Sequence, residues 1–288
     1  MLMKITLIGG DGRTLALARR LKMQGASLSC LGLPPGAPNE APDLFSALEG
    51  SEAIILPLPA TRDGIHPTSE GEREMPQLSE IFSRAPEECL LLGGMLSPAL
   101  LALAEAEGLE AVDYYKSERL LEKNAALTAE AAVGMAIFDL PISLSAATVC
   151  VIGAGRIAAA LVRLLRAFSA RVLVYARREE ARAEARTWGA EALPIPTGTP
   201  LSLPRATRAV FSTVPARLFD RAAVEELPRG IPFYDLGGGG IDAEAAKARG
   251  ILLPGAAGLP GRFFPETAGA YLFDEIRAIL FEKRGVSF

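Results

Sequence analysis

The stretch that most constrains the fold is a glycine turn near the middle of the chain, Ala147-Thr-Val-Cys-Val-Ile-Gly153-Ala-Gly155-Arg-Ile-Ala158. Val149 to Ile152 form an apolar run typical of a buried strand, and the residues that follow have the spacing of a helix. In such a unit the first glycine allows a tight turn, the second lets a pyrophosphate approach the backbone, and a small third residue lets the helix pack on the strand. A plain strand–turn–helix without a ligand is the alternative interpretation.

A second apolar strand, Arg171 to Tyr175, follows at the distance expected of a βαβ unit and favours dinucleotide binding. The helix after Gly155 would offer free N–H groups and its positive dipole end to the phosphates. Later strands end in Thr213-Val-Pro215 and at Gly237, which we expect to face the nicotinamide. The predicted cofactor site therefore comprises Gly153, Gly155, Arg156, Ile157, Arg177, Arg178, Thr213, Val214, Pro215 and Gly237.

The residues after Tyr175 predict NADP in preference to NAD, although NAD stays open. Enzymes that choose NAD usually place a carboxylate there to bind the ribose hydroxyls, but this chain has Ala176, Arg177 and Arg178. Guanidinium groups can bind a 2′-phosphate through charge-assisted hydrogen bonds. The alternative is that both arginines cap a surface helix, although cations are unfavourable at that positive dipole end.

Length and composition indicate a globular protein of two α/β domains. The chain has 288 residues, of which 50% are hydrophobic, and a net charge of -4. That charge gives no general attraction to nucleic acid or to an anionic membrane, although a local basic patch stays open. The three cysteines stand singly in apolar runs, which favours reduced thiols and argues against zinc or another metal. A first strand at Lys4 to Ile8 without a signal segment predicts a cytoplasmic protein.

The first domain begins with strand Lys4 to Ile8, a turn ending at Arg13, and a helix from Thr14 to Met23. This turn departs from the dinucleotide pattern, because Leu15 replaces the third small residue and Asp11 would repel a pyrophosphate. We interpret it as a site for a substrate carboxylate or carbonyl. Arg13 is then a candidate anion ligand, with a solvated surface arginine as the alternative.

Alternating strands and helices predict that the first domain has a flavodoxin-like parallel sheet. The expected strands are Ser27 to Leu33, Ala53 to Pro57, Cys89 to Leu92 and Leu109 to Val112, with helices near Leu44 to Leu48, Pro76 to Ser83 and Pro98 to Glu107. Ligands of such sheets bind at the carboxyl ends of strands, so Arg62 should lie beside the active cleft. His66, the only histidine, is interpreted as a solvated loop residue, with catalysis as the alternative.

A long helix from Ser117 to about Phe138 should join the two domains. Asn124 and Thr128 lie four residues apart on one face of it, and interhelical hydrogen bonds and ligand binding explain them equally well. In the second domain we expect a charged helix from Glu179 to Trp188 and strands Ala209 to Ser212, Ile231 to Leu236 and Ile251 to Leu253. An amphipathic C-terminal helix should return to the first domain. The predicted fold is α/β: two Rossmann-like, doubly wound parallel-sheet domains, with residues 1–138 and 268–288 binding substrate and 139–267 binding NAD(P).

This layout resembles that of D-2-hydroxy acid dehydrogenases, but those enzymes rely on a histidine late in the cofactor domain and none follows His66 here. A closer resemblance is to the A-subunit family of dipicolinate synthases. The stretches that carry it are Ile8-Gly-Gly-Asp-Gly-Arg13, Ile55-Leu-Pro-Leu-Pro59 with Arg62-Asp-Gly64, Asp113-Tyr114 with Glu118 and Asn124, Thr128-Ala-Glu130, Tyr234-Asp-Leu236, Gly239-Gly-Ile-Asp242, Leu259-Pro-Gly261 and Pro265-Glu-Thr-Ala-Gly269. Thr213-Val-Pro215 and the glycines from Gly237 depart modestly from that family.

The resemblance implies an oxidoreductase that makes pyridine-2,6-dicarboxylate from a cyclic precursor of the lysine pathway, namely dihydrodipicolinate or its hydroxylated tetrahydro form. It also implies a setting in the mother cell of a sporulating bacterium, together with a flavoprotein-like second subunit. Two substrate carboxylates need cationic partners, and the candidates are Arg13, Arg62, Arg119 and Arg262. Arg13 and Arg62 are favoured because they follow strand ends. Asn124 and Thr128 complete the substrate candidates. The candidate proton carriers are Glu118, Lys116 and Tyr114, although a structural salt bridge is the stronger interpretation of Glu118.

One other function stays open: the chain could be a nucleotide-binding scaffold or regulatory subunit without turnover alone. A homo-oligomer is a further open possibility for its assembly. An enzyme like shikimate dehydrogenase is disfavoured, because no lysine lies near the strand end at Pro59 to Asp63.

Overall fold

The computed structural model describes residues 3–286 and divides the chain into two compact units. The first unit comprises the residues up to Asn124 together with those from Pro260 onward, and the second unit runs from Ala125 to Leu259. The predicted boundaries, 138/139 and 267/268, lie further along the chain at both points. Each unit has its own parallel sheet and its own core.

Five parallel strands form the sheet of the first unit, in the order β2-β1-β3-β4-β5. They are β1 (Lys4–Ile8), β2 (Ser27–Leu31), β3 (Ala53–Ile55), β4 (Leu90–Gly93) and β5 (Glu110–Asp113). This is the flavodoxin-like order, in which ligands bind outside the carboxyl ends of the strands. The predicted fold class is confirmed, although β2 and β3 end earlier than expected.

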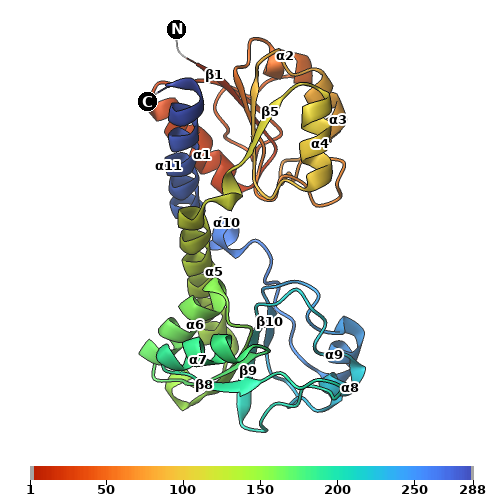
Figure 1. The fold of residues 1–288 in the computed structure, drawn as a ribbon, viewed down its shortest axis with the longest axis vertical. Coiled ribbons are helices and arrows are strands. Elements are labelled where there is room, and N and C mark those ends of the chain that lie inside the picture. Colours follow the sequence, from red (N-terminus) through yellow and green to blue (C-terminus); the bar gives the residue numbers. More distant parts are fainter. Residues whose placement is uncertain (1–2, 287–288) are drawn as a thin grey trace. The chain divides into compact units, whose positions relative to one another are not determined.

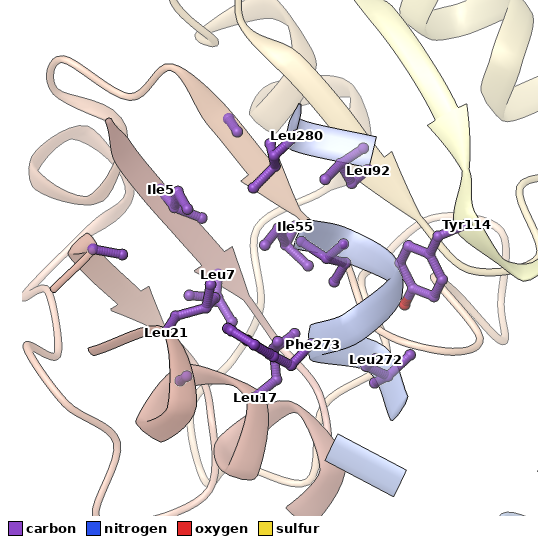
Figure 2. Close-up of a cluster of buried hydrophobic side chains, with 14 of the residues drawn as sticks. Ile5, Leu7, Leu17, Leu21, Ile55, Leu92, Tyr114, Leu272, Phe273 and Leu280 are labelled. Carbon is purple, nitrogen blue, oxygen red and sulfur yellow. The ribbon is translucent and has the colours of Figure 1, made fainter. Parts of the chain in front are cut away.

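Helices cover both faces of this sheet (Figure 1). One face carries α1 (Gly12–Met23) and α11 (Pro265–Arg284), and the other carries α2 (Leu44–Leu48), α3 (Leu78–Ser83) and α4 (Pro98–Ala106). Figure 2 shows the core on the first face, where Leu17 and Leu21 of α1 meet Leu272, Phe273 and Leu280 of α11 over Ile5, Leu7, Ile55 and Leu92 of the strands. Each such side chain contributes about 1.5 to 3 kcal/mol when fully buried.

The last helix packs closely on the first because Gly269 has no side chain. A Cβ at Gly269 would lie 2.5 Å from Cβ of Ala16 and 2.9 Å from the carbonyl oxygen of Arg13. The carboxyl end of α11 is held by Glu110 of β5, which pairs with Lys283 at 3.0 Å and Arg284 at 2.9 Å. The core of the first unit is therefore complete only when both ends of the chain are in place.

One long helix, α5 (Glu118–Asp139), runs from the first unit into the second and follows the 3-10 turn η1 (Tyr114–Lys116). Its bounds agree closely with the predicted helix. Near its start, Arg119 pairs with Glu275 at 2.9 Å and Lys123 approaches Asp274 at 3.5 Å, both on α11. Arg119 is exposed and the other three side chains are partly exposed, so each pair contributes at most about 1 kcal/mol.

The second unit also has a parallel sheet, in the order β10-β9-β6-β7-β8. Its strands are β6 (Thr148–Ile152), β7 (Arg171–Ala176), β8 (Glu191–Pro194), β9 (Thr207–Ser212) and β10 (Phe233–Asp235). Counted from β6 the order is 5-4-1-2-3, which is that of a Rossmann domain with its switch point between β6 and β9. One face carries α6 (Arg156–Ala167) and α7 (Glu179–Thr187), and the other carries α8 (Arg221–Glu225) and α9 (Ala243–Arg249) (Figure 1).

Several short elements differ from the sequence predictions. Ile251–Leu253 was predicted as a strand but makes only a single bridge, between Leu252 and Pro232. The sequence pattern does not predict β8, α8, α9, the 3-10 turn η2 (Leu144–Ala146) or α10 (Leu259–Phe263). Each is too short to show a clear period in the sequence, and tertiary contacts decide its conformation.

Cys30, Cys89 and Cys150 are buried free thiols in the interior of the two units. Burial raises the pKa of Cys30 to about 12 and those of Cys89 and Cys150 to about 11. No helix within residues 3–286 is both long and apolar enough to cross a membrane. In the same range, no group of three or more His, Cys, Asp or Glu side chains is arranged to hold a metal ion.

Candidate functional site

The glycine turn lies between β6 and α6, as the sequence predicts. Gly153 has a φ of +105°, which L side chains rarely adopt, and a Cβ there would lie 2.4 Å from Oγ1 of Thr213. Gly155 is the N-cap of α6, and no side chain caps the first turn of this helix. A Cβ at Gly155 would meet no other atom within 4 Å. The turn therefore leaves open space before a helix N-terminus, where the dipole favours an anion.

A cavity of about 560 Å³ opens beside this turn. Six of the ten predicted cofactor residues line it: Gly153, Gly155, Arg177, Arg178, Val214 and Pro215. Ala176, Ile195 and Leu218 add apolar surface. A volume of this size and a mostly apolar lining with a few polar groups are typical of small-molecule sites. The residues present therefore fit a dinucleotide.

The other four predicted cofactor residues lie outside the lining and shape the site in different ways. Arg156 and Ile157 are the first two residues of α6, so their backbone N–H groups belong to its uncapped first turn. Thr213 donates its N–H at 2.8 Å and its hydroxyl at 2.9 Å to the carbonyl oxygen of Ile152, which joins β9 to β6. A Cβ at Gly237 would lie 2.5 Å from the backbone of Val214, so only glycine fits there.

Arg177 and Arg178 stand at the end of β7, on the edge of the cavity, and both side chains are exposed. Neither guanidinium takes part in an ion pair with any residue between 3 and 286. The nearby carboxylate of Glu179 is engaged by Arg182 at 2.5 Å and by Arg186 at 2.9 Å. Two guanidinium groups beside the positive end of α7 therefore make this edge of the cavity attractive to an anion.

The turn of the first unit does not form the predicted anion site, because another segment of the chain covers it. The Gly10 N–H donates to the carbonyl oxygen of Thr68 at 2.7 Å, and the Glu70 N–H donates to that of Gly10 at 2.9 Å. Arg13 is only 6% exposed, and its guanidinium binds Asp11 at 2.7 Å and the carbonyl oxygen of Leu58. The predicted role of Arg13 as a substrate ligand is thus corrected, since its hydrogen bonds hold the fold together.

Tyr114 is also poorly placed for its predicted role as a proton carrier. Its ring is 2% exposed, and its hydroxyl donates to the carbonyl oxygen of Leu56 at 2.9 Å. Burial raises the pKa of Tyr114 far above its ordinary value. Its neighbour Asp113 accepts hydrogen bonds from the N–H groups of Met95, Leu96 and Tyr115, which ties the ends of β4 and β5 together. Both residues of this motif therefore have structural roles.

The remaining substrate and proton-carrier candidates have different surroundings. Arg62 and Lys116 follow the carboxyl ends of β3 and β5; both are exposed, and neither forms an ion pair within the described part of the chain. Glu118, the first residue of α5, is exposed as well. Asn124 donates to the Tyr115 hydroxyl at 2.9 Å, whereas Thr128 is buried and belongs to the second unit. Among the candidate arginines, Arg119 forms an ion pair with Glu275.

Sequence reasoning missed an interaction in the loop after β3. The Nδ1 atom of His66 lies 2.8 Å from Oδ2 of Asp63, and Oδ1 of Asp63 accepts the N–H groups of Ile65 and His66, each at 2.8 Å. Hydrogen bonds from the backbone and the ring of His66 hold the pKa of Asp63 well below its ordinary value. The signal for this turn was the Asp63-Gly64 pair, since aspartate side chains bind backbone N–H groups further along a turn.

Residues 4–115 match the family described as the N-terminal domain of the dipicolinate synthase A-subunit. The dipicolinate synthase A-subunit of Bacillus subtilis (strain 168) is 26% identical to this chain, and the match covers 97% of this chain and 96% of that protein. The crystal structure of the dipicolinate synthase A-subunit from Bacillus halodurans has a TM-score of 0.82 at 26% identity and covers 96% of this chain and 97% of that one. The chain is similar to dipicolinate synthase A-subunits over nearly its whole length. The predicted resemblance to that family is thereby confirmed.

Residues 110–200 match the family described as D-isomer specific 2-hydroxyacid dehydrogenase, NAD binding domain. The apo-structure of D-lactate dehydrogenase from Escherichia coli has a TM-score of 0.66 at 16% identity, covering 99% of this chain and 98% of that one, and this likeness concerns the fold alone. The second unit thus contains a stretch similar to the nucleotide-binding domain of NAD-dependent dehydrogenases. These matches support an oxidoreductase-type protein with a nicotinamide cofactor.

Proposed function

We propose that this protein catalyses the NADP-dependent oxidation of dihydrodipicolinate, or of its hydroxylated tetrahydro precursor, to pyridine-2,6-dicarboxylate (dipicolinate). The observation that carries the proposal is the cavity at the glycine turn of the second unit. It occurs in a chain that is similar, over nearly its whole length, to a dipicolinate synthase A-subunit.

The reaction removes one hydride and one proton from the dihydropyridine ring, and the hydroxylated precursor first loses water. A bound nicotinamide supplies the acceptor for the hydride. Because the product is aromatic, the protein mainly has to bind the ring and orient it. Gly153 and Gly155 would hold the cofactor phosphates, and the backbone of Val214 and Pro215 would border the nicotinamide.

The substrate is a dicarboxylate and needs cationic partners. Arg62 and Lys116 are the candidates that the first unit leaves exposed beyond its strand ends. A charge-assisted hydrogen bond to either group would fix one carboxylate. Asn124, with the Tyr115 hydroxyl, offers a neutral polar contact in the same unit. Glu118 and Lys116 are the groups that we propose for moving the ring proton.

The preference for NADP rests on Arg177 and Arg178, whose guanidinium groups would bind the 2′-phosphate at the edge of the cavity. At about 1.5 to 3 kcal/mol for each bond, NADP should bind about tenfold to several thousandfold more tightly than NAD. Calorimetric titration of both cofactors tests this. Equal affinities, or a preference that survives the Arg177→Ala/Arg178→Ala double substitution, would show that these arginines do not bind the phosphate.

Turnover is tested by an anaerobic assay of the purified chain with enzymatically made precursor and NADP. We expect the reduced nicotinamide and the pyridine product to appear together in a one-to-one ratio. The competing function is a nucleotide-binding scaffold, which is favoured by the absence of histidine from the second unit and by the burial of Tyr114. Cofactor binding without any change in nicotinamide absorbance would support the scaffold and refute turnover by this chain alone.

We further propose that the partner is a second, flavoprotein-like subunit, because the similar proteins are named as one kind of subunit of dipicolinate synthase. We propose that both subunits act in the mother cell of a sporulating bacterium. The same assay, repeated with the partner added, measures its contribution. A rate that the partner does not change would show that this chain acts alone.

A further inference from the structure

The loop that carries Arg62 is closed at its base. Thr61 and Pro67 form an antiparallel bridge, and just outside it the Thr68 N–H donates to the carbonyl oxygen of Ala60 at 2.9 Å. Ala60 in turn donates to the carbonyl oxygen of Gly94, after β4, at 2.8 Å. The base of the loop is therefore fixed to the sheet, and only the conformation of its tip is left to local interactions.

Asp63 sets the conformation of the tip. Its Oδ1 accepts the N–H groups of Ile65 and His66 and the hydroxyl of Thr61, at 2.8, 2.8 and 3.0 Å. Its Oδ2 is bound by Nδ1 of His66 at 2.8 Å. Both oxygens are thus engaged within the loop. Because Arg62 directly precedes Asp63, this carboxylate also fixes the backbone that aims the Arg62 side chain.

The surroundings of His66 argue that it is not itself a ligand for a dicarboxylate. His66 borders a cavity of about 420 Å³, and the other charged residues of that lining are Asp43, Arg73, Glu74 and Glu80. Three carboxylates against one guanidinium repel an anion. The Arg73 guanidinium is also turned to the backbone, where it donates to the carbonyl oxygens of Ala41 and Pro42.

We propose that Asp63 and His66 are positioning residues, which hold the loop so that Arg62 meets a carboxylate of the substrate. His66 acts through Nδ1, by locking the second oxygen of Asp63. This inference rests on the proposed function, because it takes a pyridine dicarboxylate as the ligand of the first unit. The exposed guanidinium of Arg62 has no carboxylate partner among residues 3–286, so a ligand can engage it.

The test is calorimetric titration of dipicolinate into the full chain and five variants. Arg62→Ala should weaken binding about ten- to a hundredfold, because it removes a bond between charged groups. His66→Ala should weaken it about two- to fivefold, the range of an exposed ion pair. His66→Asn should restore wild-type affinity, because its amide N–H can replace Nδ1. His66→Gln places its amide near the position of Nε2, so it should not restore the affinity. Adding His66→Ala to Arg62→Ala should have no further effect.

The outcomes separate this inference from the proposed function. A wild-type chain that does not bind dipicolinate overturns both. If the wild type binds, three results each overturn the positioning role alone: an unchanged affinity in Arg62→Ala, equal affinities in His66→Ala and His66→Asn, or additive losses in the double variant. Thermal unfolding of each variant, measured without ligand, checks that the affinities refer to folded protein.

Discussion

At Gly155 the protein leaves a space that no side chain fills, and this allows a sharp test of cofactor binding. Gly155→Ala should change the free energy of unfolding by less than about 0.5 kcal/mol, because the added Cβ meets no atom within 4 Å. The same methyl group would stand where a pyrophosphate approaches the backbone, so NADP affinity should fall at least about tenfold. Urea unfolding and calorimetry measure the two effects. An unchanged NADP affinity would place the phosphates elsewhere.

The matched control is Gly153→Ala, two residues earlier in the same turn. Here the backbone has a φ of +105° and the new Cβ would lie 2.4 Å from Oγ1 of Thr213. We expect a loss of about 1 to 3 kcal/mol in unfolding free energy, from backbone strain and the clash. The two substitutions in one motif should therefore have different effects: Gly155→Ala should lower mainly NADP affinity, and Gly153→Ala should lower mainly stability.

The three thiols give a prediction about pH. Burial raises the pKa of Cys30 to about 12, and those of Cys89 and Cys150 to about 11, above the ordinary value of 9.0. The folded state therefore favours the protonated thiols, and this contribution to stability is complete below pH 9 and declines as the pH rises above it. At pH 8, a colourless disulfide reagent that reports thiolates should detect no thiol in native protein and three after denaturation. Rapid reaction of any thiol in the native state would contradict their burial.

Site residues were harder to predict than the turn that contains the cofactor motif. Gly153 and Gly155 follow from a local pattern, so the sequence was sufficient to place them. The role of Arg13 depends on residues far along the chain, because its guanidinium donates to the carbonyl oxygen of Leu58 and a Cβ at Gly261 would lie 3.0 Å from its Nε. A sequence pattern shows an arginine at a strand end but does not show that a distant segment encloses it. The same holds for Tyr114, whose hydroxyl is bound by Leu56.

At the scale of elements, the contact between α1 and α11 is a tight packing interface that a substitution can test. Gly269→Ala should destabilise the protein by about 1 to 3 kcal/mol, because its Cβ would lie 2.5 Å from Cβ of Ala16 and the two helices would have to separate. Urea unfolding checks the value. Gly134→Ala in α5 is the control: its Cβ would meet nothing within 4 Å, so it should stabilise the helix by about 0.5 to 1 kcal/mol. A neutral Gly269→Ala would show that the interface adapts.

The long elements were predictable and the short ones were not, for a physical reason. β6 is a continuous buried apolar run, and α6 and α11 each bury one face over several turns, so all three leave a strong pattern in the sequence. α8 spans only Arg221–Glu225, and its helical form depends on capping by Asp220 and on packing of Ala223 and Val224. Leu252 pairs with β10 through one bridge only, so the predicted strand at Ile251–Leu253 does not develop.

At the scale of the whole molecule, two separate cores predict unfolding in two steps. Trp188 is the only tryptophan, and it follows α7 in the second unit. Its fluorescence should report one transition, while circular dichroism reports two. If the second unit binds NADP as proposed, a hundredfold excess over the dissociation constant should stabilise the fluorescence transition by about 2.7 kcal/mol. Coincident transitions that NADP shifts together would show that α5 couples the units into one cooperative system.

The core in Figure 2 also constrains the order in which the protein can fold during synthesis. Leu17 of α1 packs with Leu272 and Phe273 of α11, so the first unit cannot close until the last helix has left the ribosome. The second unit is contiguous from Ala125 to Leu259 and emerges complete before that point. At about 5 to 20 residues per second, the roughly 260 residues from the end of α1 to the end of α11 take roughly 13 to 50 s to synthesise, and the apolar faces of β1 and α1 lack their partner for that time. β1 and α1 are thus synthesised early but complete their packing only after α11 has been made.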